Sequence, residues 1–231
     1  GRHALPATPR LTSLRAERRN AASLAASLGG QRFDFTADFL AFQAGDVARL
    51  LTVKDFSPGR LVVISSGQVY LVTTSPRPPF LEGDADAPLV REPAKGTHDH
   101  GEWAYGMGKR AVEAELAFQA RARGVPALAL RLPVVQGEAD GNFSRRLWAW
   151  LERLGDGGPV LLPEDGAQRV RVVYVGDAAA ALVALAERSD WPSLPALNLA
   201  QPDEGTLREF LGQVARLAPV PARFVPVARD A

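Results

Sequence analysis

Cysteine is absent from the 231-residue sequence, and lysine is scarce, with three copies among 27 basic residues. Without cysteine the chain can form neither disulfides nor thiolate metal sites, and it suits a reducing compartment. No apolar run reaches the roughly 18 to 20 residues that span a bilayer, and the first ten residues, GRHALPATPR, lack the apolar stretch of a secretion signal. The formal net charge is only +1, so no strong field favours nucleic acid or an anionic membrane. These absences predict a soluble cytoplasmic protein with no membrane partner and no strong nucleic-acid signal.

Short apolar segments and helical patterns alternate along the first part of the chain. The apolar segments are rich in Val, Ile, Leu and Phe, as buried parallel strands are. We predict strands at 32–42, 59–66 and 126–133, and helices at 20–30, at 45–55 and from about Glu102 to Gly124. This alternation predicts right-handed crossovers and an α/β fold with a doubly wound parallel sheet.

After Gly141 the alternation loosens, and we predict a smaller α/β lobe. Its expected elements are a helix from Asn142 to a glycine-rich stop, a strand at PVLLP, a strand at RVRVVYV, a helix after Asp177, a strand at PALNLA and a helix from Thr206 to about Leu217. The predicted organisation is a core over residues 1–141 and a C-terminal lobe over residues 142–231, packed intimately on the core. The Pro-rich segment 75–88 is expected to be a surface loop that could act as a lid.

The stretch WAYGMGKRAVE, residues 103–113, places Tyr105 and Lys109 four positions apart, on one face of the predicted helix. An adjacent ammonium favours the phenolate form of a tyrosine, and the three donors of a lysine can hold the sugar hydroxyls of a cofactor. Ser65 and Ser66 end the strand LVVISS, at the sheet edge where ligands of α/β folds bind. A serine that binds a substrate oxygen and a tyrosine that passes a proton indicate acid–base catalysis next to hydride transfer.

These residues also have plainer interpretations. Tyr105 and Lys109 could be an exposed helix pair, and serines at a strand end are commonly turn residues. Gly106 and Gly108 each cost a helix about 1 kcal/mol relative to alanine, so they indicate either a close backbone approach or loose packing near the helix start.

Two further groups of polar residues are candidates for binding a ligand. His98 and His100 could bind a metal, but no third ligand is suggested nearby, so we expect a solvated loop and no metal site. Arg145 and Arg146 could hold a phosphate or lie on a solvated helix face. The pattern GMGKRA matches G-x-G-x-x-A but follows no strand, so it is not taken as a dinucleotide loop.

Three motifs follow one another along the chain, ISSGQVY at 64–70, YGMGK at 105–109 and RLPVVQG at 131–137. Their order and spacing resemble the extended short-chain dehydrogenase/reductase family, in its NAD-dependent epimerase/dehydratase branch. The resemblance implies a Rossmann-like sheet, NAD or NADP as cofactor, and reduction, epimerisation or dehydration of a sugar-like substrate, nucleotide-linked or free. It leaves open whether the protein is a homodimer.

The resemblance also implies roles for individual residues. The family's catalytic Ser, Tyr and Lys fall on Ser66, Tyr105 and Lys109. Cofactor contacts fall on Phe39, Leu40, Ala41, Ser65, Tyr105, Lys109, Pro133, Val134 and Val135, and substrate contacts fall on Ser66, Gly67, Asn142, Arg146 and Arg169. RVRVVYVGDAAAAL at 169–182 resembles a further family motif, in which Arg169 or Arg171 contacts substrate and Asp177 caps the next helix.

One family motif is missing. The family opens with a strand and a G-x-x-G-x-x-G turn, whose amides and helix N-terminus hold the cofactor pyrophosphate, whereas GRHALPATPR contains one glycine. LTSLRAERRNAASL at 11–24 instead resembles the family's third strand and the helix after it, with Ala16, Glu17 and Arg18 where the family has an Asp near the adenine. We therefore expect the first strand–turn–helix unit and the C-terminal end to be missing, and residues 1–231 alone to bind NAD(H) or NADP(H) poorly. The same absence supports a rival hypothesis, a non-catalytic relative that serves as an RNA-binding or regulatory scaffold.

Overall fold

A computed structural model describes residues 8–74, 77–137 and 146–228 of the chain. The chain divides into two compact units. The first comprises Gly1–Pro76, Leu81–Arg131 and Leu185–Leu197, and the second comprises Arg77–Phe80, Leu132–Ala184 and Asn198–Ala231. The domain boundary predicted between residues 141 and 142 lies outside the described residues.

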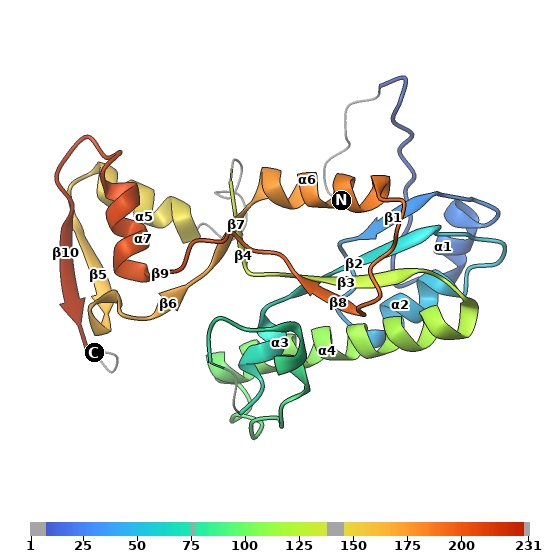
Figure 1. The fold of residues 1–231 in the computed structure, drawn as a ribbon, viewed down its shortest axis with the longest axis horizontal. Coiled ribbons are helices and arrows are strands. Elements are labelled where there is room, and N and C mark those ends of the chain that lie inside the picture. The colour runs from blue at the N-terminus through green and yellow to red at the C-terminus, as the bar shows by residue number, and fades with distance from the viewer. Residues whose placement is uncertain (1–7, 75–76, 138–145, 229–231) are drawn as a thin grey trace. The chain divides into compact units, whose positions relative to one another are not determined.

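The first unit is built on a sheet with the strand order β1-β2-β3-β8 (Figure 1). Its strands are β1 (Phe35–Asp38), β2 (Arg60–Ser66), β3 (Ala127–Leu132) and β8 (Ala196–Asn198). β1 and β2 pair in parallel, with Phe35 opposite Arg60 and Asp38 opposite Val63. The carboxyl ends of these two strands therefore lie side by side, and the predicted α/β fold with a parallel sheet flanked by helices is confirmed.

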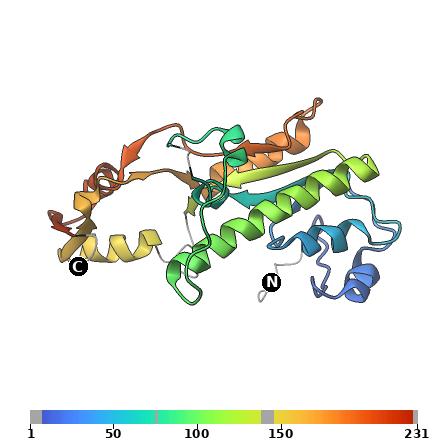
Figure 2. The ribbon, with the colours of Figure 1, turned by 90° about the horizontal axis from the view of Figure 1, so that it is seen from below.

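Two helices, α2 (Ala44–Leu51) and α4 (His98–Arg123), pack against each other on the same side of this sheet (Figures 1 and 2). The core they share with the strands is aliphatic and contains Val47, Leu51, Leu61, Val63, Val112, Leu116 and Ala129. This burial places the apolar face of α4 directly on β2, so the rest of the helix is fixed relative to the strand ends. Two short α-helices, α1 (Ala21–Leu28) and α3 (Gln68–Leu71), also belong to this unit.

Helix α4 begins four residues before its predicted start at Glu102. Thr97 caps it by accepting a hydrogen bond from the His100 amide at 3.2 Å, and Gly124 ends it in the left-handed conformation at φ 66°. His98 and His100 consequently lie in the first helical turn, so the expectation that they lie in a loop is wrong. The predicted stop at Gly124 is confirmed.

In the part of the second unit that the structure describes, there are three small strand pairs and two helices that pack together. β5 (Pro159–Pro163) pairs in parallel with β10 (Arg223–Val227), and β4 (Val134–Gln136) pairs in parallel with β7 (Val172–Tyr174), while β6 (Arg169–Val170) is antiparallel to β9 (Gly205–Thr206). Helices α5 (Arg146–Gly155) and α7 (Leu207–Ala215) cover β5 through Leu154, Val160, Leu162, Leu207 and Leu211. Helix α6 (Val175–Glu187) begins in this unit and ends in the first.

Several predicted elements differ from the structure. The single strand expected at RVRVVYV is two strands, interrupted at Arg171, whose guanidinium turns to the Gln201 carbonyl and to Glu204. Asp177 lies inside the first turn of α6 rather than at its cap. Residues 12–16 form no strand, which corrects the expected strand in LTSLRAERRNAASL. The segment expected to be a loop contains a 3-10 helix at Glu82–Asp86.

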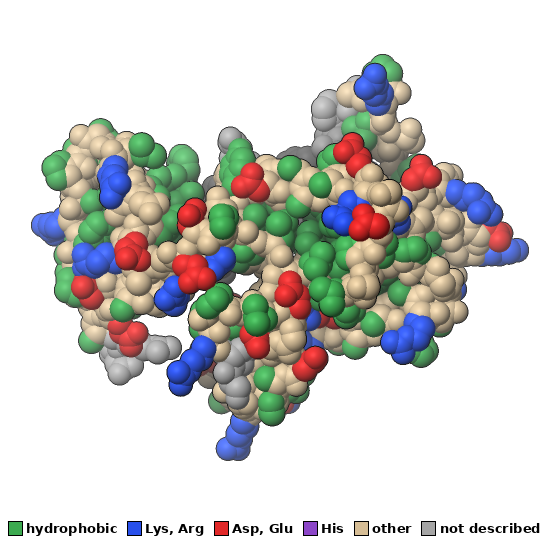
Figure 3. Space-filling view, viewed as in Figure 1, with side chains coloured by type: hydrophobic (Ala, Val, Ile, Leu, Met, Phe, Trp, Pro, Cys, Tyr) green, Lys and Arg blue, Asp and Glu red, His purple; other side chains and the backbone are tan. Residues whose placement is uncertain are grey.

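Charged side chains of both signs are interspersed on the molecular surface shown in Figure 3, in agreement with the small net charge. Among the described residues, no helix combines the length and the apolar character needed to cross a membrane.

Candidate active site

Lys109 is the buried charge at the centre of the candidate site. Its side chain leaves α4 toward the carboxyl ends of β1 and β2, where Nζ donates to the carbonyl oxygens of Ala41 at 2.7 Å and Ile64 at 2.9 Å. The residue is only 3% exposed. Burial lowers the pKa of Lys109, and the negative charges of Asp38, Glu113 and Asp46 oppose that effect. The sequence argument for an unusual lysine at this position therefore agrees with its environment.

Asp38 and Asp46 organise the loop between β1 and α2 that supplies one of these carbonyls. Asp38 forms an ion pair with Arg18 and accepts a hydrogen bond from the Leu40 amide at 2.9 Å. One oxygen of Asp46 accepts from the amides of Phe42 and Gln43, both at 3.0 Å. Burial would raise the pKa of Asp46, but these amides and Arg49 outweigh it, so the pKa lies below its ordinary value. The loop is thus held by its own carboxylates, and Ala41 presents its carbonyl to Lys109.

The two glycines of the YGMGK motif let α4 approach the strand ends closely. A Cβ atom at Gly106 would lie 2.6 Å from Val72 Cγ1 and 2.8 Å from the Gln68 carbonyl oxygen. A Cβ atom at Gly108 would lie 2.8 Å from the Phe42 carbonyl oxygen. The prediction of a close backbone approach is confirmed, and loose packing near the helix start is the wrong alternative.

Tyr105 lies one turn before Lys109 on α4, with its ring centroid 5.9 Å from Lys109 Nζ. Tyr105 is 42% exposed, so its phenol is more accessible to solvent than the Lys109 side chain, which is 3% exposed. Ser66 ends β2, and its Oγ accepts a hydrogen bond from the Gln68 amide at 3.2 Å. Gln68 also donates to the Glu102 carbonyl at 3.4 Å, which ties the turn after Ser66 to α4. The structure thus brings Tyr105 and Lys109 together, whereas convergence of the Ser66 hydroxyl with them stays a prediction.

Ser65 points the other way along the alternating strand. It is buried, and its hydroxyl donates to Glu113 on α4. The same carboxylate binds Arg131 on β3 through two hydrogen bonds, of 3.0 Å from Nε and 2.7 Å from Nη2. A cofactor contact by Ser65 would therefore fall to its backbone.

Sequence reasoning missed Glu113 and Arg131. A signal was available, because an arginine inside the apolar strand ALALRL must find a partner when it is buried. The hydrogen bonds with Glu113 outweigh the effect of burial and place the pKa of Arg131 above its ordinary value.

The other predicted site residues divide between the two units. In the first, Phe39 and Leu40 are exposed, Ala41 is fully buried, and Gly67 directly precedes α3. In the second, Pro133 precedes β4, and Val134 and Val135 belong to it. Arg169 and Arg171 share one partner, because both guanidinium groups contact the Glu204 carboxylate. Asn142 and Arg145 lie outside the described residues, and Arg146 is the first residue of α5.

Comparison with known proteins gives one family and several similar folds. The model of the NAD dependent epimerase/dehydratase family matches residues 22–200. A comparison with curated protein sequences finds no match.

Among solved structures, RMD from Pseudomonas aeruginosa complexed with NADPH is similar with 18% identity and a TM-score of 0.69, over 96% of this chain and 80% of that chain. UDP-glucose 4-epimerase from Thermotoga maritima, solved with UDP-glucose, has 17% identity and a TM-score of 0.67, over 93% of this chain and 71% of that chain. UDP-glucuronic acid 4-epimerase from Bacillus cereus, in complex with UDP-glucuronic acid and NAD, has 17% identity and a TM-score of 0.59, over 80% of this chain and 54% of that chain. At these identities the likeness concerns the fold.

Proposed function

This chain belongs to the NAD dependent epimerase/dehydratase family, and on that premise we propose that it is an NAD(P)-dependent epimerase, dehydratase or reductase of a sugar-like substrate. The observation that carries the proposal is the Lys109 ammonium. It is buried at the strand ends and hydrogen-bonded to two backbone carbonyls rather than to a carboxylate. A buried charge in such a setting is expensive for stability, and perturbed groups of this kind concentrate at functional sites.

The donor set fits one half of a nicotinamide dinucleotide. An ammonium has three N–H donors, of which two are used here, so a third can meet a ribose hydroxyl. Phe39 and Leu40 directly precede Ala41 in the chain, and their exposed side chains offer apolar surface to a ligand. The described residues contain no G-x-x-G-x-x-G turn for the pyrophosphate, so the proposal concerns the ribose and nicotinamide half.

Each side chain then has a specific task. When bound, NAD(P) supplies the hydride acceptor or donor. Tyr105 takes the proton of a substrate hydroxyl as that carbon loses its hydride, and it returns the proton in the reverse reaction. Lys109 holds the cofactor ribose through its third N–H, and Ser66 donates a hydrogen bond to the same substrate oxygen as Tyr105.

We propose a nucleotide-linked sugar as the substrate, because the similar epimerase structures contain UDP-glucose or UDP-glucuronic acid. Arg169 would contact its phosphates. Since Arg169 shares Glu204 with Arg171, the ligand would have to compete with this carboxylate or bind through the remaining guanidinium N–H groups.

Calorimetric titration with NADH and NADPH tests the proposal. We expect weak binding by residues 1–231, in the millimolar range that corresponds to about 4 kcal/mol. Lys109→Met removes a charge-assisted hydrogen bond worth about 1.5 to 3 kcal/mol, so it should weaken binding by at least about tenfold. Lys95→Met, at an exposed loop position, serves as the matched control and should have no effect. Equal affinity of Lys109→Met and the unaltered chain, or no binding by either at millimolar ligand, would contradict the proposal.

A further inference from the structure

Lys109 and Glu113 lie one turn apart on α4, at positions i and i+4, where oppositely charged side chains of a helix normally meet. Both groups also reach neighbouring residues of the same strand. Lys109 donates to the Ile64 carbonyl, and the next residue, Ser65, donates to Glu113. A direct ion pair between the two would be the ordinary outcome, yet Lys109 donates to the carbonyls of Ala41 and Ile64 instead.

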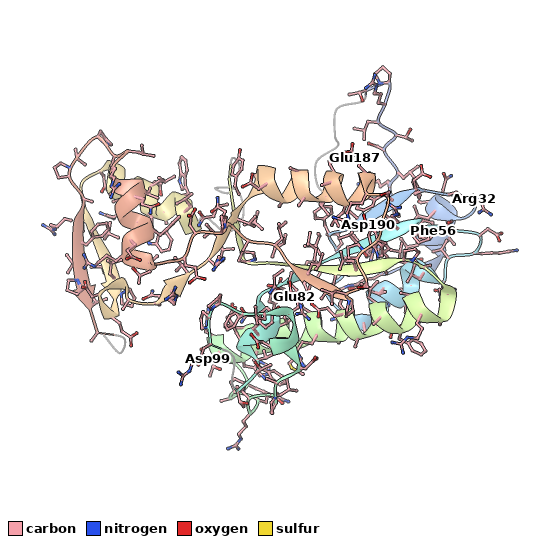
Figure 4. The ribbon with its side chains drawn as sticks, viewed as in Figure 1. Arg32, Phe56, Glu82, Asp99, Glu187 and Asp190 are labelled. Atoms are coloured by element: carbon pink, nitrogen blue, oxygen red, sulfur yellow. The ribbon has the colours of Figure 1, made fainter. Side chains whose placement is uncertain are left out.

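Arg131 binds the Glu113 carboxylate, with which Lys109 would otherwise form an ion pair. Its guanidinium binds both oxygens of Glu113, a fork geometry that lysine cannot reproduce. The same guanidinium donates through Nη1 to Tyr70 Oη and to the Glu82 carbonyl, each at 2.8 Å. Glu82 lies beside α3, as Figure 4 shows. The Arg131 guanidinium therefore has hydrogen-bond partners in α4, in α3 and in the 3-10 helix at Glu82–Asp86. These contacts keep it in place, so it cannot readily move with Glu113 toward Lys109.

The same arrangement holds at the other carboxylates whose charges act on Lys109. These are Asp38 at the end of β1 and Asp46 in α2. Asp38 forms an ion pair with Arg18, and Asp46 forms one with Arg49. Each of the three carboxylates thus forms an ion pair with an arginine. Their negative charges act on Lys109 from a distance, whereas the hydrogen bonds of Lys109 go to carbonyl oxygens.

We propose that Arg131 is a positioning residue that holds Glu113 away from Lys109, so that the third N–H of Lys109 stays available to a ligand. The inference rests on the proposed role of Lys109 in binding a cofactor ribose. Once released, Glu113 would take that N–H, because a buried carboxylate without a partner is far costlier than one in an ion pair.

The scarcity of lysine makes the proposal directly measurable. With three lysines in the chain, a 13C-lysine NMR spectrum contains three side-chain signals, and Lys109→Met identifies the one from Lys109. In Arg131→Met, we expect the acid dissociation constant of Lys109 to fall by more than about tenfold, because the new contact with Glu113 favours the ammonium. In Glu113→Gln/Arg131→Met, no carboxylate is released, and the constant should return to within about tenfold of its original value.

Glu115→Gln is the matched control. It removes the same charge from the same helix, where Glu115 contacts Gln119, and it should leave all three lysine signals in place. A folded Arg131→Met variant whose Lys109 titrates as before would overturn the proposal, as would a double variant that fails to restore the titration.

If Arg131→Met does not fold, Glu113→Gln decides the question alone. The proposal expects this change to alter the dissociation constant of Lys109 by less than about tenfold, whereas a larger rise would show that Glu113 is already the partner of Lys109. These measurements need no cofactor, so a chain that binds no NAD(P) would refute the proposed function without deciding this one. With NADH present, Arg131→Met should bind at least about tenfold more weakly than the double variant.

Discussion

Gly106→Ala should destabilise the protein even though it replaces a poor helix former with a good one. The residue lies in the middle part of α4, where alanine is favoured over glycine by about 1 kcal/mol. The added methyl group would, however, lie 2.6 Å from Val72 Cγ1 and 2.8 Å from the Gln68 carbonyl oxygen. Neither neighbour can move freely, because Val72 is buried and the carbonyl belongs to the backbone of α3.

The magnitude follows from comparison with Gly101, another glycine of α4. A methyl group there meets no atom within 4 Å, so Gly101→Ala should raise the free energy of unfolding by up to about 1 kcal/mol. Both substitutions share the gain in helix propensity, and their difference isolates the steric overlap. Overlaps in packed interiors typically cost about 1 to 3 kcal/mol, and we expect Gly106→Ala to be less stable than Gly101→Ala by that amount.

Urea unfolding followed by circular dichroism measures this difference. The slope of the unfolding free energy with urea should be the same for both variants, since the surface exposed on unfolding is the same. If Gly106→Ala proved as stable as Gly101→Ala, the close approach of α4 to α3 would be incorrect. The close packing that places Lys109 at the strand ends would then also be in error.

Two other predictions concern charge. The pKa of Lys109 is lower in the folded than in the unfolded chain, where it is near 10.5. Between these two pKa values the unfolded chain binds more protons, so the contribution of Lys109 to the unfolding free energy rises with pH. The unfolding free energy of the unaltered protein minus that of Lys109→Met should therefore increase toward pH 10.5, as measured by urea titrations at successive pH values. RNA binding should be weak, unselective and strongly reduced by salt, because the net charge is only +1; tight, sequence-selective binding at physiological salt in a filter assay would instead support the scaffold hypothesis.

The elements that were predicted well from the sequence are those whose apolar pattern agrees with the residues that start and end them. The strand β2 contains the continuous apolar run from Leu61 to Ile64, and α4 ends at a glycine followed by Val125 and Pro126, so local signals were sufficient. The start of α4 was misplaced because THDHGE is polar, whereas in the structure the His100 amide donates a hydrogen bond to the Thr97 hydroxyl, which caps the start of the helix. Strand β10 was missed because RFVPV contains a proline, and its pairing partner β5 lies about sixty residues earlier in the chain.

The candidate site was predictable in its local part and not in its long-range part. Tyr105 and Lys109 are four residues apart, and helix geometry alone places them together. The partners of Lys109 are backbone carbonyls of Ala41 and Ile64, which no side-chain pattern can reveal. The contact of Glu113 with Arg131 joins α4 to β3 across the packed interface, so it depends on the crossover between them and not on spacing in the chain.

The two adjacent serines at the end of β2 make this strand sensitive to insertions and deletions. Ser65 donates to Glu113, and Ser66 accepts from the Gln68 amide, so the alternation of the strand sends one hydroxyl to each side. A slip of one residue toward the N-terminus would place Gly67 at the position of Ser66. A slip in the opposite direction would place Ile64 at the position of Ser65. Either slip leaves only one hydroxyl where two are used. Changes in chain length between homologous proteins should therefore accumulate in the loops before Arg60 or after Leu71, and not within the seven residues of β2.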